Sequence, residues 1–308
     1  MKMEEVKIEK LSDYVDVVCE METKQERNGA DKNEILLYRG QSDKAYKLIP
    51  SLGRSRMFAC DISIFDEERN LIEMAKYRLP DVFRKDLEPL ELLSLLQHHG
   101  IPTRLLDISE NAFVALYFAC ADEKNKNKDG AVFTFQDNEV DVTNYPIIQA
   151  IADSYRFLNA SFSGLDDFYK CILAQPYFLE QKEALRSSSR TDQGRANWIE
   201  SCCKKPLFVY APARHLRQQM QRGRYILFPN KISQDEKTGR LYFEKVIEPI
   251  SEEDESIYRK IIIPTKHKDR FIRELRQFGI SRESLFADSI DVVCSEIVAG
   301  CQRRISGQ

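Results

Sequence analysis

Apolar and polar positions divide the first half of the chain into short segments with either strand or helix spacing. Short apolar runs or strict alternation predict strands, whereas apolar residues three or four apart predict amphipathic helices. The expected strands are residues 6–8, 35–38, 103–106 and 131–135, and the expected helices are residues 11–21, 66–77, 90–98 and 112–119. Asp107 stands three residues before Glu110, which predicts that Asp107 is the N-cap of the helix over 112–119.

The second half of the chain begins with a helical stretch and then returns to strands. Helices are expected over 147–158, 166–173 and 177–185, so residues 137–206 are interpreted as a helical insertion within a single domain spanning 1–308. Further strands are expected over 207–210, 225–228, 241–247 and 259–263. Gly239 is expected to turn the second of these strands into the third as a hairpin, and Gly279 to end a helix over 268–277.

This order of elements predicts the fold class. Strands interrupted by helices at uneven intervals are typical of an α+β fold rather than of a doubly wound parallel sheet. The sequence therefore predicts a mixed or antiparallel central sheet with flanking helices. The composition agrees with a folded domain, since the 308 residues are 43% hydrophobic and 31% charged.

Charge and cysteine content exclude several classes of protein. The net charge of -3 and the pI near 6.0 argue against a surface that binds polyanions everywhere, so any nucleic-acid contact would be local. No apolar run is long enough to span a membrane, and the expected location is the cytoplasm. The eight cysteines show no Cys-x-x-Cys spacing, which predicts free thiols and no metal site.

Arg39 is the first candidate for chemistry. It follows a buried strand and precedes Gly40, so its guanidinium would emerge where a ligand can approach the backbone closely. One interpretation is that Arg39 holds a phosphate, with Arg54 and Arg56 nearby. The other is that it pairs with a buried carboxylate and fixes the strand.

A second polar group lies between two apolar segments. Gln97, His98 and His99 end a helix, and Thr103, Arg104 and Asp107 follow in the next extended segment. Adjacent histidines point in different directions, which disfavours a shared metal. Arg104 and Asp107 either form a buried ion pair that supports Arg39 or contact a ligand directly.

A third polar group is the stretch from Arg214 to Arg224, which holds four arginines and three glutamines. Arg217, Gln219 and Gln221 could bind phosphates or ribose hydroxyls, and the alternative is a solvated helix and turn. The chain lacks the glycine-rich phosphate loops of Walker or Rossmann type, the Gly-x-Ser-x-Gly elbow and the His-Glu-x-x-His motif. These absences remove the usual evidence for three classes of mechanism.

Several of these segments together resemble the FRG family, a bacterial module named after a Phe/Tyr-Arg-Gly tripeptide. The matching segments are Tyr38-Arg39-Gly40-Gln41, residues 48–54, 97–107 and 115–119, Arg217 with Gln221 and Gly223, and residues 261–286. The order of elements also resembles the ADP-ribosyltransferase fold. That resemblance places its site at Arg39, at 103–107 and at 219–221, where Gln219 and Gln221 stand in place of the expected catalytic glutamate.

The resemblance implies a toxin-like or anti-phage effector that binds an NAD-like nucleotide and transfers or hydrolyses ADP-ribose. Arg39 would hold the phosphates, Gln41 and Gln221 the ribose or the nicotinamide amide, and Arg104 with Asp107 would brace the site. The alternative is a non-catalytic or nuclease-type module that binds RNA or DNA through 214–224 and Arg54, with 137–206 as a surface for a protein or nucleic-acid partner. The nucleotide hypothesis requires Arg39, the turn after His98-His99 and the amides before Gly223 to meet at one cavity.

Overall fold

Seven strands form one sheet in the part of the chain that this computed structural model describes, namely residues 4–27, 34–54, 64–138, 145–158, 163–178, 191–212 and 216–287. Their order is β1-β10-β4-β2-β3-β7-β6, and only β1 and β10 pair in parallel. The strands are β1 Glu4–Lys7, β2 Glu34–Gln41, β3 Leu105–Ser109, β4 Gly130–Asn138, β6 Leu207–Val209, β7 Gly223–Leu227 and β10 Ile257–Ile263. A smaller sheet joins β5 Ser163–Gly164, β9 Leu241–Phe243 and β8 Ile232–Gln234.

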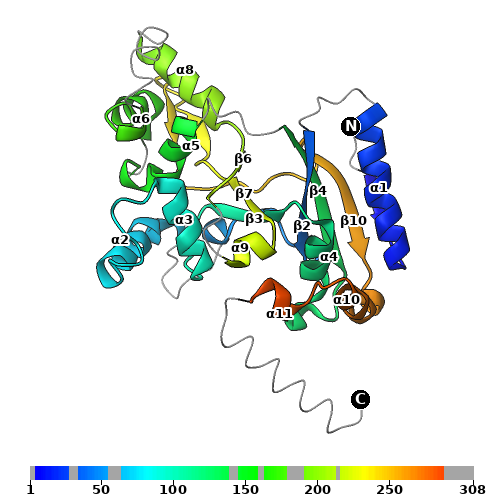
Figure 1. Cartoon of the computed structure of the whole chain (residues 1–308). Helices are drawn as coiled ribbons and strands as arrows, with labels where there is room; N and C mark the ends of the chain where they lie inside the picture. Colours follow the sequence, from blue (N-terminus) through cyan, green and yellow to red (C-terminus); the bar gives the residue numbers. More distant parts are fainter. Residues whose placement is uncertain are drawn as a thin grey trace.

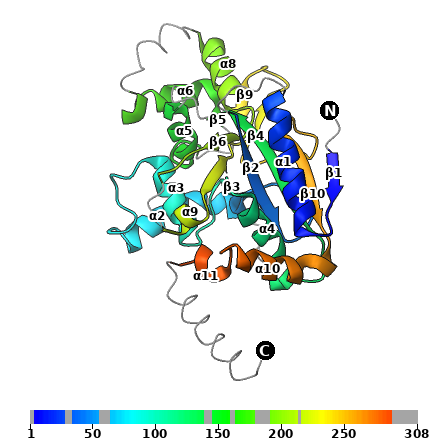
Figure 2. The same cartoon turned by 45° about the vertical axis from the view of Figure 1, so that its right-hand side comes forward.

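Helices cover the large sheet in two groups (Figure 1). The helices α1 Leu11–Arg27, α4 Ala112–Cys120 and α10 Lys268–Gln277 pack on one face of β2, β4 and β10. The helices α2 Glu68–Arg78, α3 Pro89–His98, α5 Tyr145–Ala152, α6 Leu165–Ile172 and α8 Asp192–Cys203 surround the end formed by β3, β7 and β6. Figure 2 shows the short helices α9 Leu216–Met220 and α11 Arg282–Leu285 near α3 and α10, respectively.

Alternating side chains explain why the central strands are buried on both faces. Leu36 and Tyr38 of β2 pack in the core beneath α1, α4 and α10, whereas Leu37 faces the opposite core. The strand β4 divides in the same way, with Val132 on the helix side and Phe133 on the other. These cores confirm the α+β class with a mostly antiparallel sheet and flanking helices.

The large sheet is split between β2 and β3. β2 pairs with β4 along its whole length, from Glu34 opposite Asn138 to Gln41 opposite Ala131. Its pairing with β3 is limited to Tyr38 opposite Ser109. Beyond that pair the strands separate, so residues 39–41 and 105–108 face each other without a ladder of backbone hydrogen bonds.

Gly40 allows α4 to lie directly on β2. A Cβ atom at Gly40 would stand 1.8 Å from the Ala115 carbonyl oxygen and 2.8 Å from the Ala119 nitrogen. No side chain fits there, which explains the glycine of the Arg-Gly pair by the close approach of two backbones.

Several expectations about individual elements need correction. Asp107 does not cap the helix over 112–119, because it lies within β3 and the side chain of Asn111 caps α4 instead. The Gly239 turn, with φ +68°, joins β8 to β9, while β7 pairs with β3 and β6. The expected helix over 177–185 is described only at its start, where Pro176–Phe178 form a 3-10 turn, and the remainder lies outside the described residues.

Other expectations agree with the structure. The helix α10 ends before Gly279, which has φ +77°, as the sequence predicts. Between β4 and β6 the described residues form α5, α6, α8 and β5, and the boundaries 137–206 and the single domain over 1–308 stay predictions. Within the described ranges, no helix combines the length and apolarity that crossing a bilayer requires.

Candidate functional site

A cavity of about 320 Å³ occupies the split between β2 and β3. Its walls come from the end of β2, from β3, from α4 and from α9 with the following turn. The polar side chains that line it include Arg39, Gln41, Arg54, Asp107, Arg217 and Gln221. Residues from three distant parts of the sequence therefore meet at one cavity.

The Arg39 side chain bridges the two separated strands. Its Nη1 donates a hydrogen bond to the backbone carbonyl of Asp107 in β3. Its Nε is buried and has no hydrogen-bond partner among the described residues. A buried donor without a partner is costly, so this nitrogen would gain from an acceptor supplied by a ligand.

Electrostatics at Arg39 also favour an anion. The pKa of Arg39 is lowered to about 10, chiefly by burial; the charge of Asp107 opposes this shift, and the nearby charge of Arg54 adds to it. Two guanidinium groups therefore repel each other across the same cavity wall. An anionic ligand between them would relieve both the repulsion and the loss of hydration.

Two glutamines supply amide groups. Gln41 is 4% exposed, its Nε2 donates to the Lys47 carbonyl at 3.4 Å, and its buried Oε1 has no partner in the described part of the chain. The Nε2 of Gln221 donates to the carbonyl of Leu285 in α11 at 3.0 Å, while its backbone carbonyl accepts from Ser109. The Gln41 oxygen is thus a vacant acceptor, suited to a ligand hydroxyl or amide N–H.

Asp107 supplies a carboxylate held by a chain of hydrogen bonds. Gln97 Nε2 donates to Asp107 Oδ1 at 2.8 Å, and the hydroxyl of Thr103 donates to Gln97 Oε1. Neither Gln97 nor Thr103 lines the cavity, and their hydrogen bonds connect Asp107 to α3. The structure thus places them as supports for Asp107.

Arg104 does not pair with Asp107. It is 1% exposed, and its Nε donates to Glu68 Oε1 at 2.8 Å while Nη2 bonds to the other carboxylate oxygen. Its Nη1 donates to Asn230 at 3.0 Å. The local reason is strand geometry, because residues 104 and 107 are three positions apart and project to opposite faces.

The histidines and Gln219 are not part of the cavity wall. The rings of His98 and His99 contact each other at 4.9 Å, and His99 also contacts Phe83. The described residues contain no cluster of three or more histidine, cysteine or acidic groups that could hold a metal ion. Cys19, Cys120, Cys171, Cys202 and Cys203 are free thiols, as expected, and the other three cysteines lie outside the described residues.

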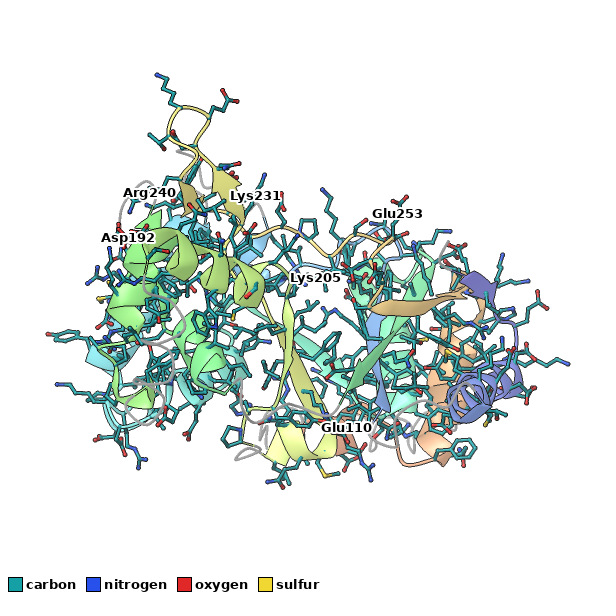
Figure 3. All side chains as sticks on the ribbon, turned by 90° about the horizontal axis from the view of Figure 1, so that it is seen from above. Glu110, Asp192, Lys205, Lys231, Arg240 and Glu253 are labelled. Atoms are coloured by element: carbon teal, nitrogen blue, oxygen red, sulfur yellow. The ribbon has the colours of Figure 1, made fainter. Side chains whose placement is uncertain are left out.

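Most described arginines between 214 and 224 contact groups within the protein. Arg217 lies over the ring of Phe286 at 4.6 Å, and Arg224 forms an ion pair with Glu110 and lies over Tyr210. Figure 3 shows Glu110 beside α9. Arg214 and His215 lie outside the described residues.

Sequence reasoning missed Tyr46 and Asp122, which also line the cavity. Asn125 donates to the Tyr46 hydroxyl at 2.8 Å and to Asp122 at 3.0 Å, and the Ser42 hydroxyl donates to Asp122 at 3.0 Å. These residues lie in loops after β2 and α4. Neither apolar periodicity nor a motif marked them.

Comparison with known proteins identifies a domain family over the part of the chain that holds this site. Residues 34–128 match the model of the FRG domain. No curated protein and no solved structure matches the chain. The matched segment holds β2, β3 and α4, so it includes the split in the sheet. The chain therefore contains an FRG domain, and this domain supplies Arg39, Gln41, Arg54 and Asp107 to the cavity.

Proposed function

We propose that the cavity binds an anionic nucleotide of the NAD type. The observation that carries this proposal is the meeting of Arg39, Arg54 and Arg217 at one cavity, with a buried and unpartnered Nε on Arg39. Guanidinium groups match the geometry of phosphate oxygens and bind them with charge-assisted hydrogen bonds. Arg39 and Arg54 hold the phosphates in this proposal.

The amides and the carboxylate suit the rest of such a ligand. Gln41 and Gln221 bind the ribose hydroxyls or the nicotinamide amide, since an amide both donates and accepts hydrogen bonds. Gln221 stands where the ADP-ribosyltransferase resemblance expects a glutamate, and Asp107 lies in the same cavity. We assign to Asp107 the stabilisation of positive charge at the ribose during ADP-ribose transfer or hydrolysis.

The hydrolysis balances without an added cofactor. The bond between ribose C1′ and the nicotinamide nitrogen breaks, and neutral nicotinamide leaves with the electron pair. Water adds its oxygen to C1′ and releases one proton. In transfer, a nucleophilic group of an acceptor takes the place of water.

Binding is tested by calorimetric titration of NAD into the full chain. Arg39→Met keeps much of the side-chain volume and removes the charge, so NAD affinity should fall about ten-fold or more. Arg78→Met, at the exposed end of α2, is the control and should bind like the wild type. If Arg39→Met fails to fold, Arg54→Met tests the same charge from an exposed residue.

The same samples separate the nucleotide proposal from the nucleic-acid alternative. If NAD does not bind and oligonucleotides bind with a steep dependence on salt, the nucleotide proposal is wrong. Nicotinamide release by the wild type and its loss in Asp107→Asn would support turnover. NAD binding without release in the wild type would contradict the role given to Asp107.

We propose a toxin-like or anti-phage effector as the cellular role. Expression of the wild type should slow bacterial growth or phage propagation, because a nucleotide such as NAD would be consumed or sequestered. Arg39→Met should abolish the effect while Arg78→Met retains it. Equal effects of the wild type and Arg39→Met would contradict the link between the cavity and the cellular role.

A further inference from the structure

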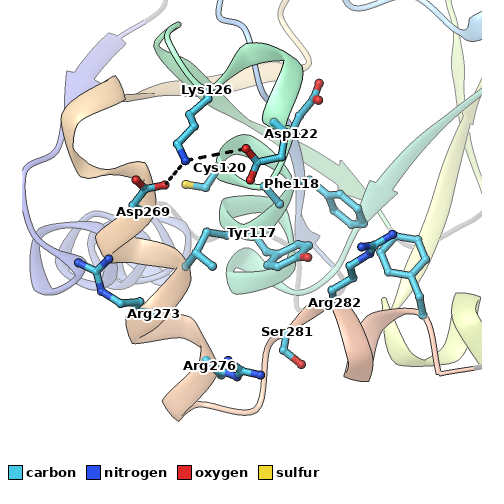
Figure 4. Close-up of a pocket in the computed structure, with 14 residues that line it drawn as sticks. Tyr117, Phe118, Cys120, Asp122, Lys126, Asp269, Arg273, Arg276, Ser281 and Arg282 are labelled. Atoms are coloured by element: carbon cyan, nitrogen blue, oxygen red, sulfur yellow. Dashed lines mark ion pairs between the residues drawn. The ribbon is translucent and has the colours of Figure 1, made fainter. Parts of the chain in front are cut away.

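A second and larger hollow adjoins the cavity. It has a volume of about 730 Å³ and lies between α4, α10 and α11, and we call it the α10 groove (Figure 4). Phe118 and Asp122 line both hollows, so they form a shared wall. The two hollows therefore meet at these two residues.

Basic side chains dominate one side of the α10 groove. Arg273 and Arg276 come from α10, and Arg282 begins α11. Among the described residues, Arg273 and Arg282 make no ion pair, whereas Lys126 on the opposite side lies 3.9 Å from Asp269 and 3.8 Å from Glu123. The groove thus has positive charge available for a phosphate.

Aromatic rings lie where the cavity and the α10 groove meet. The ring of Phe118 meets Tyr117 at 5.6 Å and Phe286 at 6.2 Å, both edge to face. Arg217, which lines the cavity, covers the other aromatic neighbour, Phe286, at 4.6 Å. Aromatic faces beside arginines are a common way to bind a base next to its phosphate.

The shared wall also carries a carboxylate. Asp122 accepts hydrogen bonds from Ser42 at 3.0 Å, from Asn125 at 3.0 Å and from the backbone nitrogen of Lys124 at 3.0 Å. A carboxylate disfavours a phosphate directly beside it but accepts hydrogen bonds from sugar hydroxyls. The boundary between the two hollows therefore suits a ribose of the ligand.

Size supports a ligand that occupies both hollows. The cavity of about 320 Å³ is near the lower limit of roughly 300–1,000 Å³ for small-molecule sites, which suits one nucleotide half. A dinucleotide has two such halves joined through phosphates. The adjoining α10 groove offers the additional volume, the aromatic wall and the cations that a second half requires.

We infer that the α10 groove binds the second nucleoside half of a dinucleotide whose first half occupies the cavity. This inference rests on the proposed function and specifies its substrate class as dinucleotides rather than mononucleotides. The base lies against Phe118 and Phe286, and Arg282 and Arg273 bind the phosphate or ribose of that half. Figure 4 shows Arg282 close to Phe118, with Arg273 and Arg276 further along α10.

The test compares the affinity for a dinucleotide with the affinity for one of its mononucleotide halves. NAD and nicotinamide mononucleotide are titrated separately into the wild type, Arg282→Ala, Arg273→Ala and the control Arg78→Ala. The ratio of NAD affinity to mononucleotide affinity should be well above one in the wild type and in the control. It should fall about ten-fold in Arg282→Ala, because a contact with a phosphate is lost only by the dinucleotide.

The outcomes distinguish this inference from the proposed function. If the wild type binds neither compound, the proposed function fails and this inference fails with it. If NAD binds but the ratio is near one, or if the ratio is unchanged in both Arg282→Ala and Arg273→Ala, only the role of the α10 groove is wrong. Thermal midpoints of the variants within the range of the Arg78→Ala control show that α10 and α11 stay folded.

Discussion

At the scale of single residues, Gly40 has the sharpest structural requirement. A methyl group there would overlap the backbone of α4, with only 1.8 Å to the Ala115 oxygen. Because backbone cannot move aside like a flexible side chain, Gly40→Ala should lower the free energy of unfolding by at least about 3 kcal/mol. Urea denaturation followed by circular dichroism measures this loss.

Gly100 provides the control for that substitution. It has φ +81° and no atom near the position of an added Cβ, so Gly100→Ala introduces only backbone strain. The expected cost is about 1 kcal/mol. Equal losses for the two variants would mean that α4 does not press on β2 as described.

Arg54 should separate binding from stability. It is exposed, and its positive charge repels that of Arg39. Arg54→Ala should change the free energy of unfolding by less than about 0.5 kcal/mol, as is usual for exposed positions. The affinity for NAD should nevertheless fall about ten-fold, because an arginine that binds the phosphates is lost. A variant that binds NAD like the wild type would exclude Arg54 from the site.

At the scale of elements, the buried pair of Arg104 and Glu68 connects β3 to α2. Its exposed fractions are 1% and 7%, and Arg104 also reaches Asn230 after β7. Glu68→Gln leaves a buried guanidinium without its counter-charge, so the free energy of unfolding should fall by about 3 kcal/mol. Chemical denaturation measures the change.

The double variant Glu68→Met with Arg104→Met checks the cause of that loss. Replacing both charges by apolar groups of similar volume removes the uncompensated charge, so stability should recover in large part. If the double variant is as unstable as Glu68→Gln, loss of specific packing rather than an unpaired charge is responsible. NAD binding should persist in the double variant, since neither residue lines the cavity.

Periodicity predicted most helices and central strands, and the errors have physical causes. The three-residue strand β8 is too short to give an alternation signal, so the sequence pattern predicts the wrong partner strand for the hairpin at Gly239. The interpretation that Arg104 and Asp107 form an ion pair is wrong, because extended backbone projects residues three positions apart onto opposite faces. Glu68 lies 36 residues away, and no local pattern points to it.

The sequence predicts several residues of the candidate site, but it does not predict the shape of the cavity. Polar groups next to apolar segments indicate Arg39 and Asp107, and the stretch rich in arginine and glutamine over 214–224 indicates Gln221; the structure places all three on one cavity wall. The split between β2 and β3 could not be predicted, since both strands have ordinary apolar patterns. It depends on long-range packing against β4 and β7, which a local pattern does not contain.

At the scale of the whole molecule, stability should depend on the protonation of Asp153. This residue follows α5 beside the large helical core and is 3% exposed. Burial raises the pKa of Asp153 to about 6 from 3.8, although Arg156, Lys76 and Tyr177 oppose the shift. The folded chain therefore holds a proton on Asp153 at pH values where the unfolded chain has lost it.

The sign of the pH dependence follows from this difference. Between about pH 4 and pH 6 the folded state binds more protons than the unfolded state, so the contribution of Asp153 to stability decreases as pH rises. From pH 4.5 to pH 7.5 this contribution should fall by about 2 kcal/mol. Because asparagine cannot ionise, the stability of Asp153→Asn should not show this decrease with pH.

Urea denaturation of the wild type and Asp153→Asn at pH 4.5 and pH 7.5 measures that contribution alone, because every other titrating group is common to both proteins. The free energy of unfolding of the variant minus that of the wild type should be about 2 kcal/mol larger at pH 7.5 than at pH 4.5. The ion pair with Arg156, at 2.9 Å, is already included in this expectation, because the charge of Arg156 is one of the groups that lower the pKa of Asp153. A difference that is flat, or that shrinks as pH rises, would mean that Asp153 is ionised in the folded protein throughout this range and that water or the Arg156 and Lys76 charges outweigh burial.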